Sequence, residues 1–164
     1  YLQISNKELD KALRCIAAVR DAVGKEIDLL IEGHGRFNVP TGIKIAKELE
    51  QFKPMFFEEP VPPDNLDALK AVRDKSPVAI SAGERLYTRW DYRKMFDLMA
   101  ADYIQPDISH AGGIMELKKI SALADMHYTG FAPHNPSGPV ANAATLQLAG
   151  AIHGFRILEI MMNN

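Results

Sequence analysis

The sequence predicts an α/β fold of the (β/α) TIM-type barrel class, and three observations lead to this prediction. Short apolar runs alternate with helical patterns along the whole chain, which is typical of a parallel sheet with helical crossovers. A titratable residue ends each of six such runs, at intervals of 26, 26, 23, 27 and 25 residues: Glu32, Glu58, Glu84, Asp107, His134 and Glu159. No glycine-rich nucleotide-binding motif follows the first strand, which favours a barrel over an open nucleotide-binding sheet.

The first half of the chain is expected to form three helices and three strands. Ser5 and Glu8 have capping-box spacing, and the helix that they begin is expected to end at Gly24. This helix contains Cys15, the only cysteine, which excludes an internal disulfide and is expected to be a small buried side chain. Asp64 is the expected cap of the third helix. The strands are expected at residues 27–32, 55–58 and 78–84, and the second and third helices at 40–51 and 64–75.

The second half repeats the pattern three more times. Thr88, with Asp91 three residues later, resembles another helix cap. Helices are expected at residues 88–99, 114–126 and 140–153, and strands at 102–105, 128–132 and 156–160. A barrel needs eight strand–helix units and about six are counted here, so we expect an incomplete barrel. Residues 1–164 are interpreted as the C-terminal part of one catalytic barrel domain, without its early strands and without an N-terminal capping domain.

Composition limits the classes of function. The net charge is −2 and no cluster of Lys or Arg stands out, so we expect no nucleic-acid partner. No apolar run approaches the roughly 20 residues of a membrane span, and no signal-peptide pattern is visible, so we expect no membrane association and a cytoplasmic location.

Three glutamates at equal intervals are the candidate metal ligands. Glu32, Glu58 and Glu84 all end predicted strands, and barrel enzymes carry their chemistry at the C-terminal ends of strands. The spacing selects Glu58 over Glu59 as the inward residue. Two unit charges about 4 Å apart repel by roughly 4 kcal/mol at an effective dielectric of 20, so converging carboxylates need a proton or a cation. A set made only of oxygen ligands suits a hard cation, with Mg²⁺ first.

The remaining strand ends supply acid–base groups. Asp107 and His134 end neighbouring strands, and an Asp behind a His fixes its tautomer and raises its basicity. His34 lies two residues after Glu32, so strand alternation predicts that both side chains point the same way. Glu159 ends the last expected strand, where a protonated carboxyl could donate a hydrogen bond to a developing oxyanion.

These stretches resemble the C-terminal barrel of the enolase superfamily, mandelate racemase subgroup, and within it the galactonate dehydratase-like sugar-acid dehydratases. The resemblance covers essentially the whole chain, in the family's order. It is carried by five segments, at residues 32–36 (EGHGR), 57–60 (FEEP), 83–87 (GERLY), 105–113 (QPDISHAGG) and 132–139 (APHNPSGP).

The resemblance implies roles for the candidate residues in a Mg²⁺-dependent hydro-lyase. Glu32, Glu58 and Glu84 would hold Mg²⁺, although the family usually has Asp at the position of Glu32. His134, oriented by Asp107, would remove the proton next to the carboxylate of a sugar-acid substrate. His34 would protonate the departing 3-hydroxyl and Glu159 would hydrogen-bond the substrate carboxylate or enediolate, giving a 2-keto-3-deoxy acid. The full-length protein would be expected to form a homo-oligomer.

Two alternatives remain open at this stage. A racemase, epimerase or lactonising isomerase on the same scaffold would exchange the alpha proton without expelling hydroxide, and the presence of His34 argues against it. A barrel fragment or degenerate member that binds a ligand without turnover is the second alternative.

Overall fold

Five short parallel strands follow one another in sequence order, β1-β2-β3-β4-β5, within one sheet. The computed structural model describes residues 3–161. The chain divides into two units, residues 1–80 and 81–164, and the division falls within β3. The strands are β1 (Leu30–Glu32), β2 (Phe56–Glu58), β3 (Ile80–Ala82), β4 (Tyr103–Ile104) and β5 (Gly130–Phe131). A helix separates each strand from the next, so the predicted parallel α/β architecture of the barrel type is confirmed.

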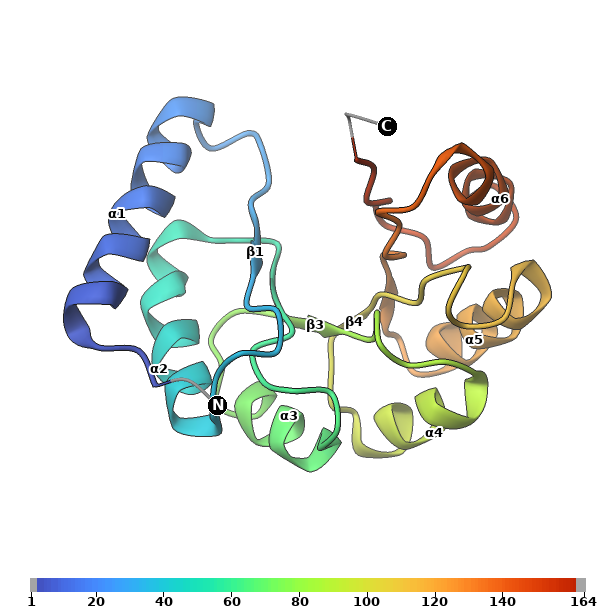
Figure 1. Cartoon of the computed structure of the whole chain (residues 1–164), viewed down its shortest axis with the longest axis horizontal. Helices are drawn as coiled ribbons and strands as arrows, with labels where there is room; N and C mark the ends of the chain where they lie inside the picture. Colours follow the sequence, from blue (N-terminus) through green and yellow to red (C-terminus); the bar gives the residue numbers. More distant parts are fainter. Residues whose placement is uncertain (1–2, 162–164) are drawn as a thin grey trace. The chain divides into compact units, whose positions relative to one another are not determined.

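The helices of the first unit begin and end with clear local signals. They are α1 (Asn6–Val23), α2 (Val39–Leu49) with the 3₁₀ turn η1 (Glu50–Phe52) behind it, and α3 (Leu66–Arg73). Ser5 and Glu8 form the predicted capping box, and Gly24 ends α1 with a φ of 73°. Figure 1 shows α1 and α2 side by side along the same side of β1.

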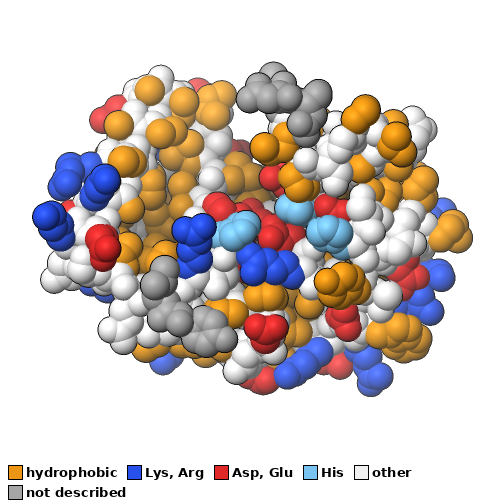
Figure 2. Space-filling model, viewed as in Figure 1, with side chains coloured by type: hydrophobic (Ala, Val, Ile, Leu, Met, Phe, Trp, Pro, Cys, Tyr) orange, Lys and Arg blue, Asp and Glu red, His pale blue; other side chains and the backbone are white. Residues whose placement is uncertain are grey.

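Helix α1 packs through one narrow face, and this placement contradicts the expected burial of Cys15. Leu9 is buried, and Leu13, Ile16 and Arg20 follow on the same face as half-buried residues at helical spacing. Cys15 lies about 100° around the helix from Ile16 and is exposed. Basic side chains cover part of the solvent face of α1 (Figure 2).

The second unit repeats the arrangement with α4 (Arg89–Leu98), α5 (Ile114–Met126) and α6 (Pro139–Ala149). Thr88 caps α4 as predicted, because its hydroxyl accepts a hydrogen bond from the Trp90 N–H. Helix α4 packs on α5, and α5 packs on α6 (Figure 1). None of the helices within residues 3–161 combines the length and apolar character that a membrane span requires.

Each unit has an apolar core beneath its strands. In the first unit Phe56 and Phe57 of β2 are 1% exposed and Leu49 of α2 is fully buried. In the second unit Ile104 of β4 and Phe131 of β5 are fully buried. Both faces of these strands are therefore covered, which explains why the sequence shows continuous apolar runs rather than alternation.

Several expected boundaries differ from the observed ones: the first strand begins at Leu30 and not at residue 27, and the last helix ends at Ala149 and not at residue 153. Two further expectations are wrong for identifiable reasons. The cap of α3 is Asn65 rather than Asp64, because the Asn65 side chain accepts hydrogen bonds from the N–H groups of Asp67 and Ala68 at 3.1 Å each. The strand expected at residues 156–160 is reduced to one bridge between Phe155 and Phe131.

The proline after β5 explains the missing sixth strand. The Arg156 N–H donates to the Phe131 carbonyl at 2.9 Å, and the Glu159 N–H donates to the Pro133 carbonyl at 3.3 Å. Proline has no N–H to return, so the ladder cannot continue between these segments. The remaining two bonds still fix the backbone of Glu159 against the segment that carries His134.

Candidate functional site

Two candidate metal ligands of the first unit face each other at the ends of paired strands. Strand β1 pairs with β2 in parallel, and the register sets Glu32 directly opposite Glu58. A carboxylate oxygen of one lies within 4.8 Å of a carboxylate oxygen of the other. The Glu32 side chain is 44% exposed and Glu58 is half-buried, so both remain open to a ligand. Such a pair is electrostatically unfavourable unless a cation or proton lies between them.

The loop after β1 is held against the segment after β2 by backbone hydrogen bonds. The N–H groups of Gly33 and Gly35 donate to the carbonyls of Glu58 and Glu59 at 2.8 and 2.7 Å. Gly33 is required by this close approach, because a Cβ there would lie 2.9 Å from the Glu58 carbonyl oxygen. The parallel ladder therefore continues beyond the strands and carries the loop with it.

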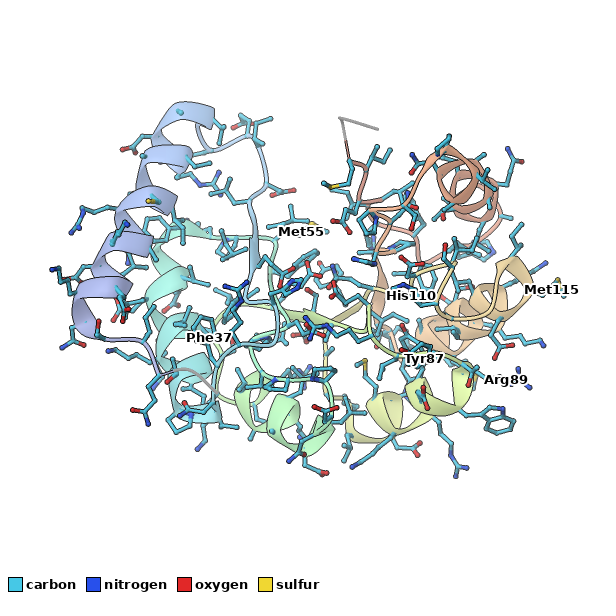
Figure 3. The ribbon with its side chains drawn as sticks, viewed as in Figure 1. Phe37, Met55, Tyr87, Arg89, His110 and Met115 are labelled. Carbon is cyan, nitrogen blue, oxygen red and sulfur yellow. The ribbon has the colours of Figure 1, made fainter. Side chains whose placement is uncertain are left out.

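His34 follows in a left-handed backbone conformation with a φ of 51°, so it belongs to a turn and not to the strand. Simple strand alternation therefore does not decide where it points. The ring Nδ1 nevertheless lies 3.9 Å from a Glu32 carboxylate oxygen, and the backbone N–H of His34 donates to the same carboxylate. An open cavity of about 340 Å³ lies beside them, lined by Glu32, Gly33, His34, Arg36 and Phe37, the last labelled in Figure 3.

In the second unit, Asp107 and His134 form a hydrogen-bonded pair. The His134 Nδ1 lies 2.8 Å from Asp107 Oδ2, and the Asp107 side chain is 1% exposed. The other oxygen of Asp107 accepts the N–H groups of Ser109 and His110 at 2.6 and 3.2 Å. Because an ionised carboxylate only accepts, the shared hydrogen lies on His134 Nδ1, and Nε2 carries the lone pair whenever the ring is neutral.

The charges around this pair shift both pKa values. Burial lowers the pKa of His134, but the hydrogen bond to Asp107 and the charges of Glu84 and Glu159 outweigh it, so the pKa is raised above 6.5. Burial raises the pKa of Asp107, but hydrogen bonds from His134 and from backbone N–H groups outweigh it, so the pKa falls below 3.8. The pair therefore favours an ionised Asp107 beside a strongly basic imidazole.

Glu84 and Glu159 lie near the Nε2 nitrogen of His134. Glu84 Oε2 lies 3.3 Å and Glu159 Oε2 lies 3.8 Å from His134 Nε2. The other oxygen of Glu84 lies 3.2 Å from Arg85 Nε, and Glu159 accepts the Asn135 N–H at 3.2 Å. Each unit thus brings its own candidates together: Glu32, His34 and Glu58 in the first, and Glu84, Asp107, His134 and Glu159 in the second.

Three residues that the sequence reasoning missed surround the second group. Asn135 binds the Glu159 backbone carbonyl and the Asn142 side chain through its amide nitrogen. Tyr92 donates its hydroxyl to the Gly83 carbonyl at 2.6 Å, and burial, followed by nearby carboxylates, raises its pKa well above 10. His110 contacts the Glu84 carbonyl at 3.1 Å. Asn135 and His110 stand in the quoted motifs, but only the fold reveals their partners.

Comparisons with known proteins identify the family of this chain. A model of the enolase C-terminal domain-like family matches residues 2–164. The chain is 38% identical over 155 residues to a D-galactonate dehydratase of Xanthomonas euvesicatoria and 37% identical over 158 residues to one of Variovorax paradoxus. These matches cover 94% and 96% of this chain but only 41% of each relative, so the chain spans about two fifths of their length.

A solved structure shows the same fold at higher sequence identity. The mandelate racemase/muconate lactonizing enzyme-like protein of Rubrobacter xylanophilus is 44% identical and superposes with a TM-score of 0.94. The match covers 96% of this chain and 40% of that protein. The chain belongs to the enolase C-terminal domain-like family of the enolase superfamily, whose barrel fold it shares.

Proposed function

We propose that the protein containing this chain is a Mg²⁺-dependent sugar-acid dehydratase, a hydro-lyase that converts an aldonate into a 2-keto-3-deoxy acid. The observation that carries the proposal is the Asp107–His134 pair, in which the second ring nitrogen of His134 lies beside the carboxylates of Glu84 and Glu159. The similarity to relatives named D-galactonate dehydratase supports the substrate class. A small sugar acid would be the substrate, and the full-length protein would form a homo-oligomer.

The proposed metal ligands are Glu32, Glu58 and Glu84. The donor set fits Mg²⁺, because the register-paired carboxylates of Glu32 and Glu58 offer hard oxygen ligands with no sulfur among them. Glu84 lies two residues after the end of β3 and would complete the set. A bound Mg²⁺ would offset the second negative charge that builds on the substrate carboxylate when the alpha proton leaves.

The chain's own residues would then move two protons. His134 Nε2 takes the proton from C2, while Asp107 holds the Nδ1–H and stabilises the imidazolium that forms. His34 gives a proton to the 3-hydroxyl, so that the C–O bond breaks with loss of water. A protonated carboxyl at Glu159 would donate a hydrogen bond to the substrate carboxylate or enediolate. The resulting enol tautomerises to the 2-keto-3-deoxy acid.

The test uses full-length protein, a panel of acid sugars with Mg²⁺, and two readouts: 2-keto acid formation and exchange of the C2 proton into heavy water. His134→Asn is expected to lower both rates by about 10²–10⁴-fold, the usual contribution of a general base. If that variant left dehydration and exchange untouched, His134 would not be the base. His34→Asn is expected to stop dehydration while C2 exchange continues.

The same experiment separates the alternative activity on this scaffold. A racemase, epimerase or lactonising isomerase would exchange the C2 proton but form no 2-keto acid from any member of the panel. A chain that binds acid sugars with Mg²⁺ and shows neither reaction would support a binding role without turnover.

A further inference from the structure

Two side chains from different elements contact the backbone carbonyls of Gly83 and Glu84. The buried Tyr92 of α4 donates to the Gly83 carbonyl at 2.6 Å. The ring Nδ1 of His110, from the loop between β4 and α5, lies 3.1 Å from the Glu84 carbonyl oxygen (Figure 3). Because a carbonyl oxygen only accepts, the hydrogen of this contact sits on His110 Nδ1.

His110 is also bonded to Asp107. Its backbone N–H donates to Asp107 Oδ1 at 3.2 Å, and its ring centre lies 6.1 Å from that of His134. One residue therefore contacts the backbone of Glu84 with its side chain and the carboxylate of Asp107 with its main chain. The main-chain contact survives substitution of the side chain, whereas the contact to Glu84 does not.

Glu84 needs this restraint because of the residue before it. Gly83 has a φ of 130°, a conformation that L side chains rarely adopt, and a Cβ there would lie 3.1 Å from Tyr92 and 3.2 Å from the Gln105 nitrogen. Only glycine fits this conformation and this space, so the residue before Glu84 has no side chain that could hold the backbone. Hydrogen bonds hold it instead: Tyr92 and the Leu86 N–H donate to the Gly83 carbonyl, and His110 contacts the Glu84 carbonyl.

We propose that His110 is a positioning residue for Glu84. Its side chain contacts the backbone of Glu84, and its backbone N–H donates to Asp107. His110 therefore holds the distance between Glu84, the proposed metal ligand, and Asp107, which orients His134. His110 acts through Glu84 and is given no contact with the substrate. The inference rests on the proposed metal role of Glu84, and the experiment below distinguishes failure of one from failure of the other.

The test measures binding of Mn²⁺, as a paramagnetic substitute for Mg²⁺, to the full-length protein by electron paramagnetic resonance. His110→Ala removes the donor to the Glu84 carbonyl and is expected to weaken Mn²⁺ binding by about 10-fold or more, as residues behind metal ligands typically do. His110→Asn places an amide N–H close to the position of Nδ1 and is expected to restore the affinity to within about 3-fold. His110→Gln, whose amide lies further from the backbone, is expected to resemble the alanine variant.

The controls make each outcome decisive. His127, which stacks on Phe96 with ring centres 5.1 Å apart, is the matched histidine, and His127→Ala should leave Mn²⁺ affinity unchanged. Wild-type Mn²⁺ affinity in both His110→Ala and His110→Gln, even with a lowered melting temperature, would reduce His110 to a structural role and overturn the inference. Glu84→Gln should itself lose affinity. If it does not, the metal role of Glu84 fails; if it does while His110→Ala binds normally, only the positioning role fails.

Discussion

In the first unit Glu32 and Glu58 are aligned by the backbone ladder between β1 and β2, whereas in the second unit His134 is aligned by other side chains. The ladder continues through Gly33 and Gly35, which donate to the residues at and after the end of β2. Alignment of His134 depends instead on the carboxylate of Asp107 at 2.8 Å. The candidate residues of the two units should therefore be sensitive to different kinds of substitution.

Exposure follows the same division. The side chains of Glu32 and His34 are 44% and 54% exposed, while those of Glu84, Asp107 and His134 are 9%, 1% and 14% exposed. The difference suits a division in which the first unit offers open ligands and the second holds a tuned base.

The largest effect, a fall in kcat, is expected from Asp107→Asn in the second unit. Removing the negative charge lowers the pKa of His134 and removes the fixed acceptor of its Nδ1–H, so kcat should fall by about 10²–10⁴-fold. The acidic limb of the kcat/KM profile should also move to lower pH. Steady-state kinetics across pH checks both expectations.

Asp125→Asn is the matched control for this substitution. Asp125 is exposed on α5, so its loss should leave kcat and the pH profile as they are in the wild type. An Asp107→Asn variant that stayed within about threefold of the wild-type kcat would show that His134 needs no orienting carboxylate.

A smaller effect is expected from Gly33→Ala in the first unit, where the backbone does the aligning. The added Cβ would meet the Glu58 carbonyl oxygen and Phe57 Cε2 at 2.9 Å, and a backbone atom cannot rotate away. Overpacking of this kind costs about 1–3 kcal/mol, and the strand ends should separate enough to weaken Mn²⁺ binding. Urea unfolding and Mn²⁺ titration measure the two consequences.

Gly150→Ala is the control for added volume, because its nearest atoms would lie 3.8 Å from the new Cβ. Gly150→Ala should change the free energy of unfolding by no more than about 1 kcal/mol. It should leave the Mn²⁺ affinity unchanged. Unchanged Mn²⁺ binding in Gly33→Ala would mean that the ladder beyond β1 is not what places Glu32.

The sequence was informative where the signal is local or periodic. The capping box at Ser5 and Glu8, the cap at Thr88 and the whole of α5 are all visible in residue spacing and are confirmed. The sequence was less informative where a partner far along the chain decides. The expected strand at residues 156–160 failed because its neighbour there is Pro133, which has no N–H to donate.

The candidate site shows the same limit. Spacing marked Glu32, Glu58 and Glu84 as equivalent strand ends, and the roles proposed for them remain predictions. Spacing could not show that the His110 ring contacts the Glu84 carbonyl or that the Tyr92 hydroxyl donates to the Gly83 carbonyl. The partners in these contacts are 26 and 9 residues apart in the sequence. His110 also begins no strand and ends none, so a strand-end rule passes over it.

The smallest expected effect is the pH dependence of stability in the metal-free protein, and it belongs to the second unit alone. The pKa of His134 is raised in the folded state, so its contribution is fully present below about pH 6.5 and is lost as pH rises through the raised value. The pKa of Asp107 is lowered, so its contribution is present above about pH 3.8 and is lost as pH falls through the lowered value. The stability difference between wild type and Asp107→Asn in EDTA should therefore peak between these limits and shrink at higher pH. A difference that grew steadily above pH 7 would show that the pair is stabilised by neutral hydrogen bonding and not by charge, and would remove the electrostatic distinction between the two units.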